Sequence, residues 1–188
     1  MVEQADFAGV VLPHLDEAYS LARWLTGSAS DAEDVVQESL MKALKHFAGF
    51  RGPAARPWLL TIVRRTCFTW LAANRPRQLV FTDDEAAVEA LNRTTVVTLH
   101  PKAADTPESL LADKQETAEL NAAVEALPAP FREVVVLREI HELSYKEIAA
   151  IAEIPVGTVM SRLARAREKL AVELRGRLGR RDHGLPDV

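Results

Sequence analysis

The apolar residues of this chain recur every three or four positions in two separate stretches, and this helical period restricts the fold more than any other feature. One stretch lies within residues 1–78 and the other within residues 109–178, whereas residues 79–108 show no sustained period and are rich in acids. We therefore expect an all-α protein with two small helical bundles, joined by a flexible acidic linker and followed by a tail at residues 179–188.

Prolines and capping residues set the ends of the helices expected in the first bundle. A capping box of Ser30 and Glu33 would begin the second helix near Asp31. Pro57 suits the first turn of a third helix, because a proline there sacrifices no helical hydrogen bond. The three helices are expected at residues 7–25, about 31–47 and 57–74.

The second bundle has the spacing of a helix-turn-helix. Ser144 and Glu147 form another capping box, at the start of a short helix. A turn at residues 153–157 joins it to a final helix over about 156–174, which is free to enter the major groove of DNA. The helix before this unit is expected to direct Ile140 inward.

The composition is that of a globular protein, with 48% hydrophobic and 27% charged residues. The single cysteine, Cys67, has no partner for an internal disulfide and is expected to be a buried apolar residue. No run of 18 or more apolar residues occurs, and the first residues lack the pattern of a signal peptide. We therefore expect a cytoplasmic protein without membrane insertion.

The net charge of −4 conceals two segregated basic segments. Residues 41–78 contain eight basic residues and no acid, and residues 155–188 contain eight basic residues and four acids. Residues 1–40 have the opposite character, with eight acids and one arginine. Because salt screens charges that lie more than roughly 8–10 Å apart, the local sign of each segment decides which partner it attracts. Both basic segments are therefore candidates for DNA binding.

Each basic segment also contains the side chains that nucleic-acid recognition uses. One face of the final helix is expected to present hydroxyl, guanidinium and ammonium groups, which bond phosphates and base edges: Thr158, Ser161, Arg162, Arg165 and Lys169. Within residues 41–78, aromatic residues alternate with basic ones, a pattern typical of single-strand binding. Phe50, in a loop next to glycines, is the best candidate there for an exposed contact.

Several segments of both bundles, taken together, resemble the extracytoplasmic function (ECF) sigma factors of RNA polymerase. In the first bundle these segments are Asp31-Ala32-Glu33-Asp34-Val35-Val36-Gln37-Glu38, Phe50-Arg51-Gly52 and residues 57–65. In the second bundle they are residues 127–128, 131–135, 143–149 and 157–167. The resemblance implies a protein that binds core RNA polymerase, recognises the −35 and −10 promoter elements and promotes strand opening.

The resemblance also implies three groups of contact residues. The helix near residue 31 would dock on core RNA polymerase through Asp31, Asp34, Gln37, Glu38 and Met41. The loop and helix that follow would hold the −10 element through Phe50, Arg51, Trp58, Arg64, Arg65, Trp70, Asn74 and Arg75. The final helix would read the −35 element through Thr158, Ser161, Arg162, Arg165, Arg167 and Lys169. Members of this family are commonly held by an anti-sigma factor, so such a partner is expected too.

Two other classes of protein compete with this interpretation. An enzyme is disfavoured because the five histidines are scattered and no glycine-rich phosphate loop occurs, so we expect no catalysis, metal or cofactor. A conventional dimeric helix-turn-helix regulator, acting without being a polymerase subunit, is the stronger alternative. Met160 and Ala164 depart from the side chains that many ECF sigma factors have there, which affects the promoter sequence that would be read.

Overall fold

The computed structural model describes the backbone of residues 3–50, 54–79 and 107–181, and the side chains of residues 7–50, 54–79 and 117–175. Within these ranges every regular element is a helix, which confirms the all-α expectation. Apart from its two ends, the predicted linker lies outside the described residues. None of the helices, as far as they are described, is both long and apolar enough to cross a membrane.

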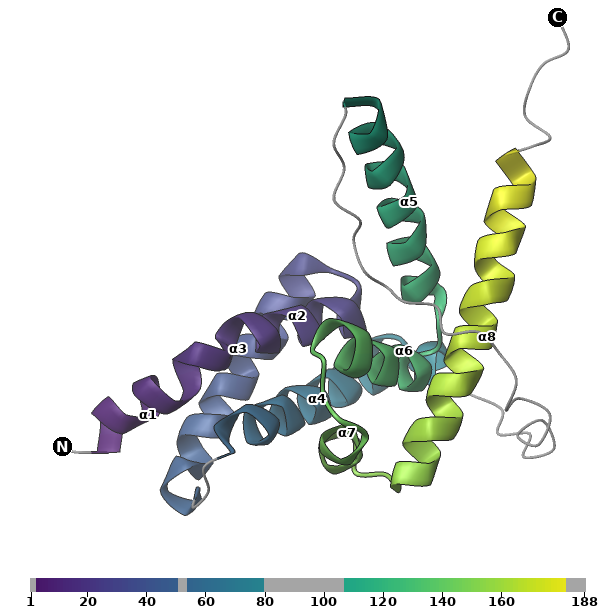
Figure 1. The fold of residues 1–188 in the computed structure, drawn as a ribbon. Coiled ribbons are helices and arrows are strands. Elements are labelled where there is room, and N and C mark those ends of the chain that lie inside the picture. The colour runs from purple at the N-terminus through teal and green to yellow at the C-terminus, as the bar shows by residue number, and fades with distance from the viewer. Residues whose placement is uncertain (1–2, 51–53, 80–106, 182–188) are drawn as a thin grey trace, which may run out of the picture.

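The first half of the chain is a compact group of helices (Figure 1). Its α-helices are α1 (Glu3–Val11), α2 (Leu15–Thr26), α3 (Ala29–His46) and α4 (Ala55–Asn74). Short 3-10 helices follow α1, α3 and α4, at Leu12–His14, Phe47–Gly49 and Pro76–Leu79. Helices α2, α3 and α4 pack against one another around buried residues that include Leu21, Leu25, Val35, Leu59 and Leu60.

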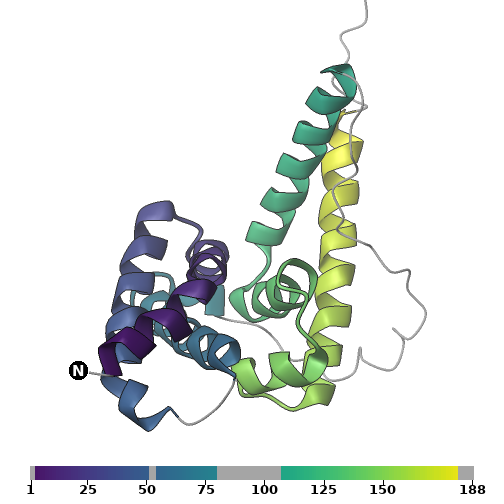
Figure 2. The ribbon, with the colours of Figure 1, turned by 60° about the vertical axis from the view of Figure 1, so that its left-hand side comes forward.

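The second half contains the helix-turn-helix and a pair of longer helices. Its elements are α5 (Pro107–Ala126), α6 (Ala129–Val135), a π-helical turn (Val136–Ile140), α7 (Tyr145–Ala152) and α8 (Val156–Arg181). Helices α5 and α8 lie side by side and project away from the rest of the molecule (Figures 1 and 2). Helices α6 and α7 pack against the N-terminal part of α8.

The two halves are packed directly against each other. Helix α4 contacts α7, and α2 contacts α6. Buried residues of both halves form one continuous apolar cluster, which includes Leu25 and Leu60 from the first half and Val134 and Leu137 from the second. The two predicted bundles therefore share a core in this structure.

Helix boundaries in the first half differ from the expectation, most clearly within the first expected helix and at the start of α3. The first expected helix is interrupted at Leu12–His14, because Pro13 has no N–H for the helical hydrogen-bond ladder. Helix α3 begins earlier than a capping box at Ser30 implied, since Ser28 is its N-cap. The Ser28 hydroxyl accepts a hydrogen bond from the Asp31 N–H at 3.4 Å.

In the second half the local signals were more accurate. The Ser144 N–H donates to the Glu147 carboxylate at 2.8 Å and the Glu147 N–H donates to the Ser144 hydroxyl at 3.3 Å, which confirms the predicted capping box.

The expectation that Ile140 points inward was wrong, since this residue is 41% exposed. It ends the π-helical turn, where one extra residue per turn shifts side chains away from the α-helical period.

The end of α2 depends on a glycine. Gly27 has a φ of +74°, in the left-handed region that favours glycine, and an added Cβ would lie 3.4 Å from Arg75 Nη1. We expect Gly27→Ala to lower the free energy of unfolding by about 1 kcal/mol, measured by urea denaturation. Gly9, within α1, has open space at its Cβ position, so Gly9→Ala should be neutral or stabilising. Equal losses in both variants would contradict this explanation.

Candidate nucleic-acid interface

The helix-turn-helix is held by its caps and by its apolar core. Ile148 and Ile151 of α7 are buried with Val159 and Leu163 of α8 in the same cluster, which fixes the crossing of the two helices. Hydrogen bonds from the Ser144 side chain and N–H hold the pKa of Glu147 below its usual value. The N-terminal turns of α8 are therefore presented by a rigid support.

The −35 residues predicted on α8 do not all lie on one open face. Ser161 and Arg165 are half-buried. The Ser161 hydroxyl donates to the Thr158 carbonyl at 3.1 Å. Lys169 is exposed, with its Nζ 5.6 Å from the ring centroid of Phe131.

The other two arginines of that predicted group lie beside acids of the second half. Arg167 Nη2 donates to Glu139 Oε1 at 2.8 Å, which ties α8 to the π-helical turn. Arg162 is half-buried and close enough to the carboxyl of Glu133 to oppose the rise in its pKa. In this conformation both side chains serve the fold of the second half.

Helix α4 has an apolar side and a basic side. Leu59, Leu60, Val63, Cys67 and Leu71 are buried in the core. Burial raises the pKa of the Cys67 thiol to about 12, which agrees with the expected role of this residue as a small apolar side chain. The basic side of α4 carries arginines that reach acids of the second half.

Two predicted −10 arginines on α4 pair with acids of the second half. Arg64 Nε donates to Glu133 Oε1 of α6 at 2.5 Å, and Arg64 also stacks over Phe68 at 4.4 Å from the ring centroid. Arg65 Nε donates to Glu153 Oε2, in the turn before α8, at 3.0 Å. Sequence reasoning missed both acids as partners of this surface.

Aromatic residues cluster at the N-terminal end of α4. Phe50 packs on Trp58 with ring centroids 4.8 Å apart and stacks on Phe47 at 6.1 Å. Phe7 meets the edge of Phe47 at 5.1 Å. Phe50 is thus half-buried, not the exposed side chain that was expected, because its neighbours offer it an apolar platform. Arg51, predicted beside it, lies outside the described residues.

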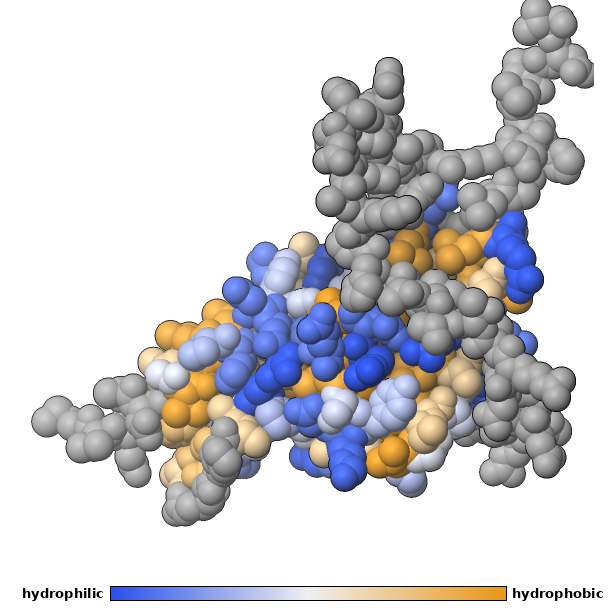
Figure 3. Space-filling model, viewed as in Figure 1, coloured by the Kyte–Doolittle hydropathy of each residue, from blue (hydrophilic) through white to orange (hydrophobic). Residues whose placement is uncertain are grey.

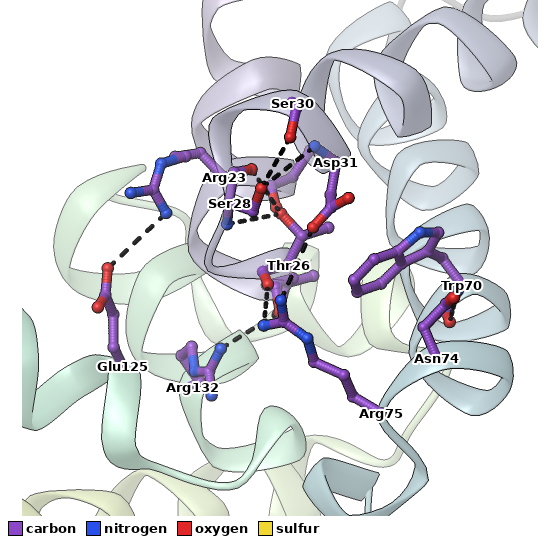
Figure 4. A network of polar contacts seen from close by, with 12 residues as sticks. Arg23, Thr26, Ser28, Ser30, Asp31, Trp70, Asn74, Arg75, Glu125 and Arg132 are labelled. Carbon is purple, nitrogen blue, oxygen red and sulfur yellow. Dashed lines mark hydrogen bonds and ion pairs between the residues drawn. The ribbon is translucent and has the colours of Figure 1, made fainter.

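The C-terminal end of α4 joins a polar network around the end of α2 (Figure 4). Arg75 Nη1 donates to the Thr26 carbonyl at 2.8 Å, its Nη2 lies 3.7 Å from Asp31 Oδ2, and its guanidinium stacks on Trp70 at 5.4 Å. Asn74 Nδ2 donates to the Trp70 carbonyl at 2.9 Å. Among these predicted −10 residues, Arg75 therefore links the end of α4 to α2 and α3.

Arg132 of α6 enters the same network from the second half. Its Nη1 donates to the carbonyls of Trp24 and Leu25 at 3.0 and 3.2 Å, and its Nη2 donates to the Leu127 carbonyl at 2.8 Å. Burial lowers the pKa of Arg132 to about 10, so the guanidinium stays charged at neutral pH. Sequence reasoning did not assign any role to this arginine.

The outward side of α3 combines acids with apolar residues. Asp34, Gln37 and Glu38 are exposed, whereas Asp31 is half-buried beside Arg75. Met41 is 69% exposed and is joined by the exposed Leu44, which sequence reasoning did not select. Figure 3 shows apolar side chains at the surface over α1 and the neighbouring end of α3.

His141 lies buried between the halves, after the π-helical turn. Its Nδ1 is 3.5 Å from Glu17 Oε2, and its carbonyl accepts a hydrogen bond from Arg56 Nη2 at 2.7 Å. Arg56 Nε also donates to Glu17 at 2.6 Å. Among the residues whose side chains are described, no group of three or more His, Cys, Asp or Glu is arranged to hold a metal.

Comparison with known sequences separates the same two halves. Residues 10–77 match the family model for Sigma-70 region 2, and residues 117–170 match the model for Sigma-70, region 4. The chain is 39% identical over 143 residues to the ECF RNA polymerase sigma-E factor of Salmonella typhimurium, across 76% of this chain and 73% of that protein. It is 38% identical, over the same shares, to the factor of that name in Escherichia coli K12.

A solved structure extends the likeness to the fold. The sigma factor RpoE of Bartonella quintana, in complex with the anti-sigma factor NepR, has a TM-score of 0.64 and 27% identity. The match covers 90% of this chain and 97% of that chain.

A basic aromatic half and a helix-turn-helix half, each matching its own sigma region, define a promoter-recognition subunit of RNA polymerase. The chain belongs to the ECF family of RNA polymerase sigma factors. The predicted function as a sigma factor is thus confirmed. A dimeric regulator that acts without polymerase is not favoured, because it gives no reason for residues 10–77 to match Sigma-70 region 2.

The buried histidine predicts a pH dependence of stability. Burial lowers the pKa of His141 below 6.5, so the unfolded chain binds more protons than the folded chain between the lowered pKa and 6.5. We expect the free energy of unfolding to fall as the pH is lowered from about 7 through this range, measured by urea denaturation. His141→Gln should reduce this loss, whereas His46→Gln, at an exposed position, should leave it unchanged. A pH dependence that survives His141→Gln intact would contradict the assignment.

Proposed function

We propose that this sigma factor docks on core RNA polymerase through α3, holds the −10 element with α4 and reads the −35 element with α8. It would act as an initiation factor without catalytic activity of its own, in the cytoplasm with the polymerase. The observation that supports this division best is the contrast between neighbouring surfaces. Helix α3 presents acids beside exposed apolar side chains, whereas α4 presents arginines and aromatic rings.

The proposed polymerase surface consists of Asp34, Gln37, Glu38 and Met41, with Leu44 added by the structure. Exposed apolar side chains of this size suit the buried centre of an interface, and the acids suit its charged rim. The negative charge of this face would select a basic partner surface and speed the encounter. Asp31 would contribute more through its contact with Arg75 than through direct docking.

The proposed −10 surface extends along α4. Arg64 and Arg65 would hold phosphates of the separated strand, and Trp58 with Phe50 would stack on an unpaired base. The aromatic cluster supports this role because Phe50 already lies parallel to a neighbouring ring, the geometry that a base would adopt. Arg51 stays part of this proposal by resemblance alone.

The proposed −35 surface lies on the N-terminal turns of α8, the part of a recognition helix that contacts base edges. Arg165 is the best candidate for a bidentate contact with guanine, and Ser161, Thr158 and Lys169 for phosphates. Met160, 54% exposed on the same turns, adds an apolar group near this surface.

An anti-sigma factor is the further partner that we propose. The solved relative from Bartonella quintana is bound to such a protein. The structural similarity over 90% of this chain supports a comparable complex here.

Transcription from a template pool with a randomised −35 region tests the proposed reading of promoters. Core RNA polymerase with this chain should enrich one −35 sequence, and Arg165→Ala should cost about 1–3 kcal/mol in binding and relax the preference at one position. Arg175→Ala removes the same charge nearer the other end of α8 and should keep the preference. Transcription that does not depend on the added chain would overturn the proposed function itself.

Charge reversal on α3 tests the polymerase surface. Asp34→Lys should weaken binding to core RNA polymerase about tenfold, because it places a base opposite basic groups. Asp16→Lys makes the same charge change at an exposed position of α2 and should have little effect. Affinity for core polymerase can be measured by fluorescence anisotropy of the labelled chain. Equal losses in both variants would mean that overall charge, not the α3 surface, controls binding.

A further inference from the structure

Four charged side chains join α4 to the helix-turn-helix half. In this interdomain ion cluster, Arg64 and Arg65 come from α4, Glu133 from α6 and Glu153 from the turn before α8. Arg64 Nε lies 2.5 Å from Glu133 Oε1 and its Nη1 lies 3.8 Å from Glu153 Oε2. Both nitrogens of the Arg65 fork, Nε and Nη2, donate to Glu153. The arginines proposed to hold −10 DNA are thus occupied by carboxylates of the same chain.

We propose that Glu133 and Glu153 make the sigma factor self-inhibiting when it is free of polymerase. A guanidinium binds a carboxylate and a phosphate through the same fork of N–H donors, so these acids compete directly with the DNA backbone. The proposal rests on the proposed role of α4 at the −10 element. Promoter contact would then require the ion cluster to separate.

The spacing of the promoter elements supports the need for opening. Their names place the −35 and −10 elements roughly 25 base pairs apart, which corresponds to about 85 Å of duplex. In this structure α4 contacts α7, the helix that supports α8, and we call this arrangement of the two halves the closed state. One molecule in this conformation cannot place α4 and α8 on both elements together, so the halves must move apart.

The two acids contribute differently to the closed state. Glu133 is fully buried and Arg64 is only 15% exposed, so their pair is shielded from salt. Glu153 and Arg65 are 44% and 61% exposed, so their pair is screened by salt and can be removed without leaving a buried charge. Glu153 is therefore the position at which the closed state can be weakened selectively.

The backbone at Glu153 allows a clean substitution. Glu153 closes α7 with a φ of +57°, where glycine is more favourable than any residue with a Cβ. Glu142 has nearly the same φ, +55°, and is exposed outside the ion cluster. Glu153→Gly and Glu142→Gly therefore remove the same charge from the same type of backbone position, and only the first touches Arg65.

Binding of the full-length chain to a fluorescein-labelled, mixed-sequence 20-nucleotide single strand, without polymerase, tests the proposal. At low salt Glu153→Gly should bind roughly two- to fivefold tighter than wild type, in line with the loss of an exposed ion pair, and Glu142→Gly should bind like wild type. Glu153→Gln, which removes only the charge, should follow Glu153→Gly. Small-angle X-ray scattering should show the same radius of gyration for wild type and both Glu153 variants, because the shared apolar core and the buried pair of Arg64 with Glu133 still hold the halves together.

The outcomes separate this proposal from the proposed function. Equal DNA affinity of wild type and both Glu153 variants would overturn self-inhibition. An enlarged radius without any gain in DNA affinity would also overturn it, since α4 would be uncovered but not competing. Failure of the wild-type chain to support transcription by core polymerase would overturn the proposed function, whatever the Glu153 variants do.

Discussion

The ion pair between Arg64 and Glu133 is the interaction on which the relative position of the two halves depends. Glu133 is fully buried, and burial raises the pKa of its carboxyl while Arg64 opposes that rise. A buried carboxylate needs a well-placed cation, and removing one partner of such a pair typically costs about 3–5 kcal/mol. Because the arginine belongs to α4 and the acid to α6, the pair determines which side of α4 meets the second half.

The neighbouring residue of α6 secures the same interface by a second mechanism. Arg132 donates to the last carbonyls of α2, where the helix dipole places partial negative charge. Arg75 reaches the next carbonyl, that of Thr26, from the end of α4. Residues of α6 and α4 thus meet at the end of α2, and two consecutive residues of α6 bind different helices: Arg132 binds α2 and Glu133 binds α4. These polar contacts of α6 add to the apolar core that the two halves share.

Local sequence signals predicted the elements of this protein well and the interface between its halves not at all. The capping box at Ser144 depends on residues three apart, so it is visible in the sequence. The pairing of Arg64 with Glu133 spans 69 positions and leaves no periodic trace. One signal could have indicated it: Arg132 and Glu133 interrupt an apolar run from Phe131 to Leu137, and charged residues in such a run need buried partners.

The neighbours of the candidate site residues were also not predictable from the sequence. The sequence predicts the arginines of α4 as a DNA-binding surface, but it does not state which acids are near them in the free protein. Phe50 was expected to be exposed because its neighbours are glycines, yet the packing surface comes from Trp58, eight positions away. Residue type predicts what a side chain can bind, whereas its actual neighbours depend on tertiary contacts.

The basic residues of α4 that contact the second half are arginines, and this explains why they suit both carboxylates and phosphates. A lysine ammonium is a strongly hydrated point charge, whereas the planar guanidinium can donate two parallel hydrogen bonds to the oxygens of either a carboxylate or a phosphate. Arg65 does this with both oxygens of Glu153 in the closed structure. Two oxygens of a DNA phosphate fit the same fork of N–H donors. Under the proposed self-inhibition, the surface that holds the protein closed would also bind the DNA strand once the acids are withdrawn.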